Sequence, residues 1–149
     1  SKQAVFLALL NRWLAGLDAA LAEARSGAAT VPDQLLRMAA VAQQVFQAGR
    51  GQLPLFLEFW TQAAHDPAVW QATIAPYHRY RNWFARLIEA GIAEGTLRPM
   101  DPTQGAQVFL SLALGIVLQG LLDPEGADWG QVAREGVGAL LHGLARSAG

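Results

Sequence analysis

The sequence predicts an all-α fold, with a single domain over residues 1–149 built from about six helices. Apolar residues recur at steps of three and four along most of the chain, which is the spacing of one face of an amphipathic helix. The two-residue alternation that is typical of half-buried strands is absent from the sequence. Proline and glycine fall at regular intervals between the periodic segments and mark where one helix ends and the next begins.

The first two helices are expected over residues 2–25 and 31–49. Ser1 can cap the start of the first helix. Pro32 lies in the first turn of the second helix, where a missing N–H group leaves no hydrogen bond unmade. The apolar stripes comprise Phe6, Leu9, Leu10, Trp13, Leu14, Leu17 and Leu21 in the first helix, and Leu35, Met38, Ala39, Ala42, Val45 and Phe46 in the second.

The next two helices are expected over residues 53–64 and 67–94. The shorter one is apolar around most of its circumference, which indicates packing on several sides. The dipeptide Asp66-Pro67 joins a capping side chain to a proline suited to a first turn, so it predicts the start of the longer helix. Pro76 lies inside that helix and should kink or split it.

The last two helices are expected over residues 102–122 and 128–146, the first of them after another Asp-Pro start signal. Apolar residues cover nearly the whole circumference of 102–122, so this helix is expected to be buried on all sides. In a single layer of helices one side would face water, and a second copy of the chain would cover it. The last helix holds four glycines, each costing about 1 kcal/mol of helix propensity relative to alanine. Close approach of another helix would explain them.

The uncharged segment 102–122 is long enough to cross a membrane, but a buried soluble helix is the favoured interpretation. Asp101 and Asp123 bracket it, where a membrane span would carry Lys, Arg or aromatic anchors. The chain has no cysteine, which fits a reducing compartment, and no secretory leader is recognised. We therefore expect a cytoplasmic protein that makes no membrane contact.

Charge and motif content argue against several functional classes. The net charge is −1 and only 15% of the residues are charged, so the basic footprint needed to grip nucleic acid is lacking. The three histidines, His65, His78 and His142, do not form a one-turn metal-binding pair. The sequence has no G-x-S-x-G nucleophile turn and no phosphate-binding glycine loop. We expect no enzyme activity, no catalytic residue, no metal and no cofactor.

Aromatic side chains are the most suggestive group for ligand binding, because most of the thirteen fall on the predicted inward stripes. A kinked helix beside a short apolar one would leave room for a cavity, where Tyr and Trp could orient a ligand. The predicted ligand-binding residues are Trp13, Met38, Phe46, Phe56, Trp60, Tyr77, Trp83, Phe84 and Phe109. An ordinary apolar core is the alternative interpretation for each of them.

Two polar features also allow two interpretations. Glu58 could recognise a cationic ligand, or it could begin a solvated polar face that continues to His65. The basic stretch 78–86 could hold an anionic ligand, or its arginines could lie along aromatic surfaces on a solvated face. We favour the solvated face in both cases.

Motifs follow one another in a set order along essentially the whole chain. They are Ser1-Lys2-Gln3-Ala4-Val5-Phe6, Leu55-Phe56-Leu57-Glu58-Phe59-Trp60, Ala63-Ala64-His65-Asp66-Pro67, Ile88-Glu89-Ala90-Gly91-Ile92-Ala93-Glu94-Gly95, Leu97-Arg98-Pro99, Asp101-Pro102, and Gly115 to Leu122 with Asp123-Pro124. In this order they resemble the regulatory domain of tetracycline-repressor-like (TetR-family) transcriptional regulators. The opening motif is similar to the S-K-x-x-L-F junction that follows the family's helix-turn-helix domain.

The resemblance implies an effector-binding and dimerisation domain. The last two helices would pair with their copies in a four-helix bundle, and a small, often apolar effector would enter a cavity among the earlier helices. Effector binding would release operator DNA if the effector prefers the non-binding conformation. The predicted dimer-interface residues are Leu114, Leu118, Leu121, Val132, Gly136, Leu140, Gly143 and Leu144.

We therefore expect the regulatory half of a homodimeric regulator, usually a repressor in this family. It would meet operator DNA only through a helix-turn-helix domain that this sequence does not contain. A free-standing helical carrier of an apolar small molecule is the alternative. The chain lacks an initiator Met and opens at a helix start, so we expect a fragment. The coding sequence upstream of Ser1 would distinguish regulator from carrier.

Overall fold

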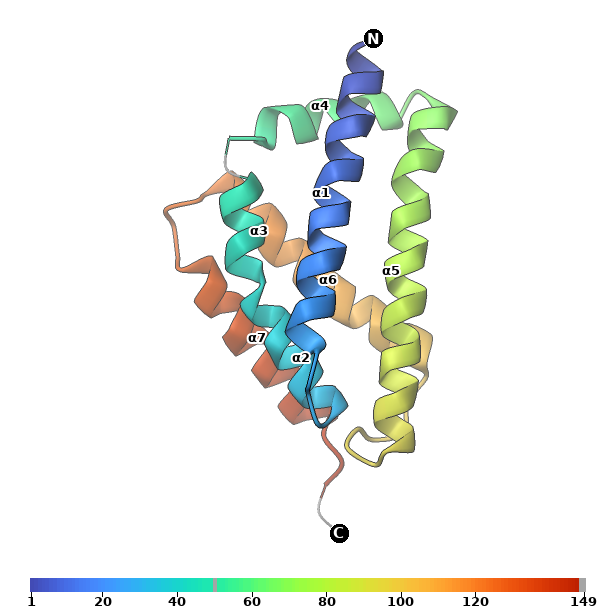
Figure 1. Ribbon diagram of the computed structural model, residues 1–149, viewed down its shortest axis with the longest axis vertical. Helices are drawn as coiled ribbons and strands as arrows, with labels where there is room; N and C mark the ends of the chain where they lie inside the picture. Colours follow the sequence, from blue (N-terminus) through green and yellow to red (C-terminus); the bar gives the residue numbers. More distant parts are fainter. Residues whose placement is uncertain (50, 148–149) are drawn as a thin grey trace.

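Helices supply the regular structure of the chain, which the computed structural model describes over residues 1–49 and 51–147 (Figure 1). The side chains of Phe46, Leu53 and Phe56 also lie outside this description. The helices are α1 (Lys2–Arg25), α2 (Val31–Ala40), α3 (Ala42–Gly49), α4 (Leu53–Ala63), α5 (Pro67–Ala93), α6 (Pro102–Leu122) and α7 (Trp129–Leu144). The described residues contain no strand, only a single β-bridge between Leu97 and Ala145. The prediction of an all-α fold is confirmed.

Capping side chains set the helix starts that the sequence predicted. Ser1 accepts a hydrogen bond from the Ala4 amide at 3.2 Å. Asp66, Asp101 and Asp128 accept from amides in the first turns of α5, α6 and α7. These carboxylates satisfy N–H groups that have no partner within the helix. The bounds of α1, α4, α5, α6 and α7 agree with the predicted bounds to within two residues, although α4 begins without a side-chain cap.

The predicted second helix is divided at Val41 into α2 and α3, so six expected helices become seven in the described residues. The Val41 amide donates to the Met38 carbonyl at 3.1 Å, three residues back. This contact tightens the turn relative to an α-helix and ends α2. Pro76 has no such effect, since α5 continues through it and the split that the sequence allowed does not occur.

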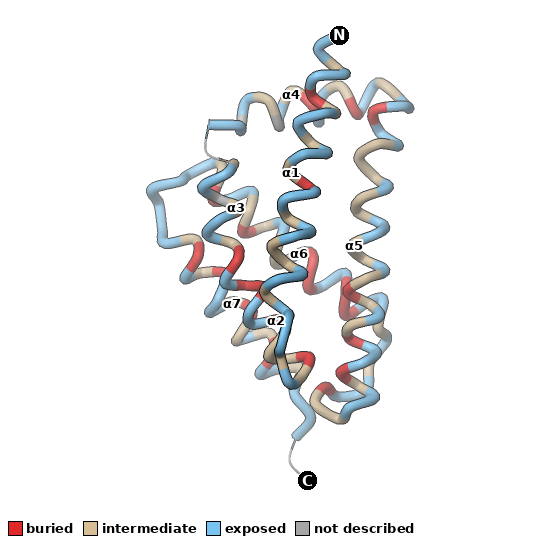
Figure 2. The backbone as a smooth tube through the Cα atoms, in the orientation of Figure 1, coloured by how far each residue is buried: buried red, intermediate tan, exposed pale blue. Residues whose placement is uncertain are grey.

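Two separate apolar cores hold the helices together. The larger core joins α2, α5, α6 and α7. Its buried residues lie mainly in the half of the bundle nearer the C-terminus, the lower half in Figure 2. The smaller core joins α1, α4 and the start of α5, where α4 crosses the N-terminal end of α1 (Figure 1). Its buried members are Phe6, Phe59, Ala63 and Val69, and the rings of Phe6 and Phe59 stack with centroids 3.8 Å apart.

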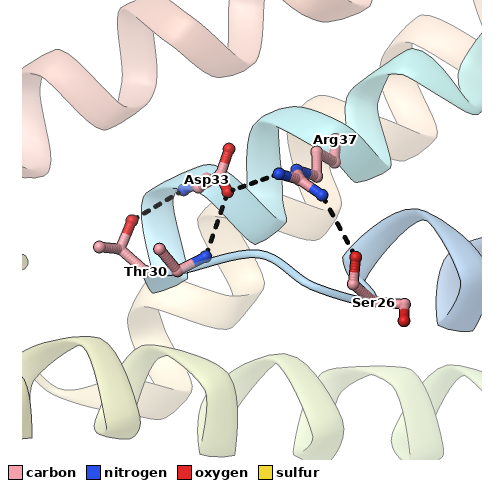
Figure 3. Close-up of polar contacts among 5 residues, drawn as sticks. Ser26, Thr30, Asp33 and Arg37 are labelled. Carbon is pink, nitrogen blue, oxygen red and sulfur yellow. Dashed lines mark hydrogen bonds and ion pairs between the residues drawn. The ribbon is translucent and has the colours of Figure 1, made fainter.

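The turn between α1 and α2 is fixed by a small polar network (Figure 3). Thr30 accepts from the Asp33 amide at 3.3 Å and so caps α2. The Asp33 carboxylate accepts from the Ala29 amide and pairs with Arg37 at 3.2 Å. Arg37 also donates to the Ser26 carbonyl at 3.2 Å. The orientation of α2 relative to α1 is therefore held by local bonds as well as by packing.

The C-terminal end of α5 closes against the start of α2. The Glu94 carboxylate accepts from the Val31 amide at 2.7 Å, and Leu97 is almost fully buried beneath Gly91. A methyl group added at Gly91 would lie 2.6 Å from Leu97 Cδ1. Only glycine lets the loop after α5 approach the helix this closely.

We predict that Gly91→Ala lowers the free energy of unfolding by about 1–3 kcal/mol, because the new methyl group overpacks the larger core. Gly16→Ala is the control, since no atom lies within 4 Å of a methyl group at Gly16. It should leave stability unchanged or raise it by up to about 1 kcal/mol through helix propensity. Urea unfolding measures both changes, and a Gly91→Ala protein as stable as the parent would contradict the packing account.

Candidate ligand-binding cavity

A cavity of about 590 Å³ lies beneath α1, where α1, α3, α4 and α6 face one another. Its size falls within the roughly 300–1,000 Å³ range of small-molecule sites. The described lining residues are Phe6, Leu9, Leu10, Arg12, Trp13, Gly16, Leu17, Ala20, Val41, Gln44, Val45, Ala48, Gly49, Gln52, Leu55, Val117 and Leu121. Phe6, Leu10 and Leu55 also belong to the smaller core or pack against it. The cavity therefore begins at the edge of that core.

Small side chains on α1 keep this space open. Gly16 and Ala20 lie on the α1 face that lines the cavity. No atom lies within 4 Å of the position that a Cβ of Gly16 would take. The surrounding wall is mostly aliphatic and aromatic, and its polar side chains are Arg12, Gln44 and Gln52. Such a wall suits a ligand whose surface is mainly apolar.

The helix over the cavity is held by a few attachments along its length. Phe6 and Leu14 are the buried residues of α1. Lys2 pairs with Glu58 of α4 at 2.5 Å near one end, and Leu21 packs against the larger core near the other. The other residues of α1 are exposed or half-buried. A ligand in the cavity would therefore add contacts where the protein supplies few.

Asp18 links the middle of α1 to α5. The Tyr80 hydroxyl donates to the Asp18 carboxylate, and Arg79 contacts the same carboxylate at 3.3 Å. Burial of the phenol and its hydrogen bond to Asp18 raise the pKa of Tyr80 well above its usual value. The Arg79 guanidinium also lies 5.2 Å from the centre of the Tyr80 ring. These contacts connect the roof of the cavity to the longest helix of the fold.

The residues predicted to bind ligand are distributed over several environments. Trp13 lines the cavity. Met38, Phe84 and Phe109 are buried in the larger core, Tyr77 and Trp83 pack against that core, and Trp60 is exposed on α4. Phe46 and Phe56 lie outside the described side chains. Apart from Trp13, the described members of the set do not line this cavity, and their ligand-binding roles stay predictions.

Sequence reasoning missed the small and aliphatic part of the cavity wall. Val41 lies at the break between α2 and α3, and Val117 and Leu121 lie on α6. They carry no mark in the sequence that separates them from core residues. Gly16 did carry a signal, because a glycine in the middle of a helix needs a reason. Among the polar features, Glu58 pairs with Lys2 and Arg79 pairs with Asp18 at the surface.

One side of α6 is uncovered in the single chain, contrary to the expectation of burial all round. Val108 is 53% exposed, Leu114 56%, Leu118 45% and Leu122 57%. Gly115 lies among them, with no atom near the position of a Cβ. The reason is that α6 packs against α5, α3 and α7, which leaves its remaining side open. We call Val108, Leu114, Gly115, Leu118 and Leu122 the outer face of α6.

The predicted dimer-interface residues divide into two groups. Leu114 and Leu118 lie on the outer face of α6, and Gly143 is exposed on α7 with open space beside it. The others already touch their own chain. Leu140 and Leu144 pack against the larger core, Gly136 faces Leu112 and Ile116, Leu121 lines the cavity, and Val132 is half-buried. The role of these residues in an interface stays a prediction.

Two helices, α1 and α6, are long and apolar enough to cross a membrane when judged by length and composition alone. The core helix of a folded domain passes the same test. One side of α6 is buried against the rest of the fold, at Gly105, Ala106, Phe109 and Leu110. The interpretation of 102–122 as a packed helix therefore agrees with its contacts.

Comparison with solved structures finds the same fold. A candidate transcriptional regulator from Saccharomonospora viridis, solved in complex with choline, is 21% identical with a TM-score of 0.77, covering 99% of this chain and 77% of that one. A candidate transcriptional regulator from Pseudomonas aeruginosa PAO1 is 20% identical with a TM-score of 0.77, covering 95% and 66%. A protein of unknown function from Rhodococcus sp. RHA1 is 24% identical with a TM-score of 0.73, covering 97% and 75%. No curated protein matches the sequence significantly.

Fold and comparisons together define the class, a TetR-like C-terminal regulatory domain of a transcriptional regulator. More particularly, residues 32–146 match the family model described as "BetI-type transcriptional repressor, C-terminal". The match spans most of the chain, and the chain belongs to this family. The recognition made from the sequence motifs is confirmed.

We predict that Tyr80→Phe lowers the free energy of unfolding by about 1 kcal/mol, because it removes the hydrogen bond to Asp18. The raised pKa means that the folded state keeps the phenol proton. This contribution is present below the usual pKa of about 10 and is lost as the pH rises through the folded-state pKa. Urea unfolding at neutral pH measures the first effect, and ultraviolet absorbance during alkaline titration measures the second.

Tyr77→Phe is the matched control for this prediction. No hydrogen bond of the Tyr77 hydroxyl is found within the described residues, although Tyr77 packs against the larger core as Tyr80 does. It should therefore change stability little. Equal losses in the two variants, or a phenol of Tyr80 that ionises in the usual range, would contradict the proposed link.

Proposed function

We propose that this domain controls the DNA binding of its full-length regulator by binding a small, largely apolar effector in the cavity beneath α1. The observation that carries the proposal is the cavity itself, a mainly apolar space of about 590 Å³ beneath a helix whose buried residues are Phe6 and Leu14. Membership of a family of transcriptional repressor domains supports a regulatory role over transport or catalysis. The protein would act in the cytoplasm, where its operator DNA lies.

Effector binding would work by changing how firmly α1 is held. A ligand in contact with Trp13, Gly16 and Leu17 on α1 and with Val117 on α6 would fix the middle of α1 relative to α6. A ligand can shift a conformational equilibrium only as far as it prefers one state. We propose that α1, the first helix of the domain, transmits that preference to a DNA-binding unit preceding it.

We also propose that the domain is a homodimer through the outer face of α6 and the neighbouring part of α7. A compact monomer of this mass exposes roughly 7,400 Å², whereas this chain exposes 8723 Å². The excess is about 1,300 Å², and a standard interface buries about 800 Å² on each partner. Four large apolar side chains of α6 contribute to it. A second copy would cover them and would bring the open glycines Gly115 and Gly143 against a neighbouring helix.

We predict that Gly16→Trp abolishes the binding of decanol, a neutral apolar probe, because the indole would occupy the cavity. Gly16→Ala is the matched control and should bind decanol as the parent does, since a methyl group leaves most of the space free. Isothermal titration calorimetry measures the affinity. Undiminished binding by the Gly16→Trp protein, or no binding by the parent, would contradict the cavity as the effector site.

We predict that Leu118→Glu converts the dimer into monomers, weakening association roughly 100-fold, because each interface would bury an unpaired carboxylate. Val5→Glu is the control, since Val5 is 61% exposed on α1, a helix that is not part of the proposed interface. Sedimentation equilibrium measures the association constants. A parent chain that is monomeric at every concentration, or a Leu118→Glu protein that associates normally, would contradict the interface assignment.

A further inference from the structure

The charge of the cavity wall has a definite sign. Among the lining residues that the structure describes, Arg12 is the charged one, and the remaining polar ones are the amides Gln44 and Gln52. No Asp or Glu belongs to this described wall. A charged group of a ligand in this cavity would therefore meet a positive side chain with no negative one beside it.

Arg12 also lacks the partner that the other cations of α1 possess. Lys2 pairs with Glu58, and the Arg25 guanidinium lies 5.3 Å from the centre of the Trp83 ring. For Arg12, no ion pair or hydrogen bond is found in the described part of the chain. Its neighbours one turn away on α1, residues 8, 9, 15 and 16, are all apolar or glycine, so the helix supplies no carboxylate either.

The aromatic groups of the wall do not make a good site for a cation. Quaternary ammonium groups are recognised by cages of aromatic faces. Phe6 and Trp13 are the described aromatic lining residues, and one face of the Phe6 ring is covered by Phe59. Trp13 directly follows Arg12, whose positive charge would oppose a cation at this wall. The charge of the site thus favours the opposite sign from the choline bound in the Saccharomonospora viridis structure.

We propose that the effector is an amphiphilic anion, with its negative head group at Arg12 and its apolar body inside the cavity. This rests on the proposed function, because it names the chemistry of the ligand in that same cavity. Arg12 is exposed and lies at the edge of the cavity-lining face of α1, beside Leu9 and Gly16. The head group therefore stays near water at the rim, while the body covers Leu9, Leu17 and Val117. A guanidinium suits a carboxylate or phosphate head because it can donate two parallel hydrogen bonds.

Three probes with the same apolar chain test this proposal, namely decanoate, decanol and decyltrimethylammonium, titrated calorimetrically at low salt and below their aggregation limits. The parent chain should bind decanoate about fivefold more tightly than decanol, as expected for an exposed charge pair. It should bind decyltrimethylammonium most weakly. Added salt should reduce the preference for decanoate without affecting decanol.

Variants separate the role of Arg12 from that of the cavity. Arg12→Gln should remove the preference for decanoate and leave decanol binding unchanged, and Arg12→Glu should favour decyltrimethylammonium. Arg134→Gln is the matched control, because Arg134 is exposed on α7 and bonds only to Gln131 in the described residues. It should behave as the parent.

The outcomes distinguish this proposal from the function on which it rests. Equal affinity for decanoate and decanol, or a preference that survives in Arg12→Gln, overturns the anionic ligand. If decanol binding is then still blocked by Gly16→Trp, the cavity remains the effector site. Failure of all three probes to bind overturns both proposals.

Discussion

The packing of α6 against α5 is the contact on which the other features of the fold depend. Phe84 and Phe109 meet with ring centroids 5.0 Å apart in the larger core. Further along the interface, Gly105 lets Ile88 come within 3.0 Å of the position that a Cβ would take. Once this side of α6 is fixed, Val117 faces the cavity and Leu118 faces outward. One uncharged helix therefore serves three environments, which explains why apolar residues surround it.

The division into two cores makes the stability of the domain uneven. The larger core holds most of the buried side chains, and backbone amides that donate to the carboxylates of Glu94 and Asp33 secure the elements around it. The smaller core has four buried members, and the cavity lies beside it. Segments with few buried apolar contacts open at lower free-energy cost than the core. The helix over the cavity is thus the part of the domain that a ligand can influence most.

The fold of this domain and the side chains of its cavity provide different information. The solved structures share its helical arrangement at 20–24% identity, which establishes the fold and leaves the ligand open. What a site binds depends on its own side chains. Here those side chains are mainly aliphatic, with Arg12 at the rim and Asp18 tying the cavity roof to α5. The same fold can therefore carry cavity walls of different charge.

The sequence by itself determined the helical class and most helix bounds, because capping carboxylates such as Asp66 and Asp101 act within a few residues of themselves. It also identified the family through ordered motifs. It did not reveal the break at Val41, nor that Phe84 and Phe109 belong to the core while Trp13 faces a cavity. An apolar stripe records that one side of a helix avoids water. Whether that side meets another side chain, an empty space or a second molecule was decided only by the tertiary packing of distant segments.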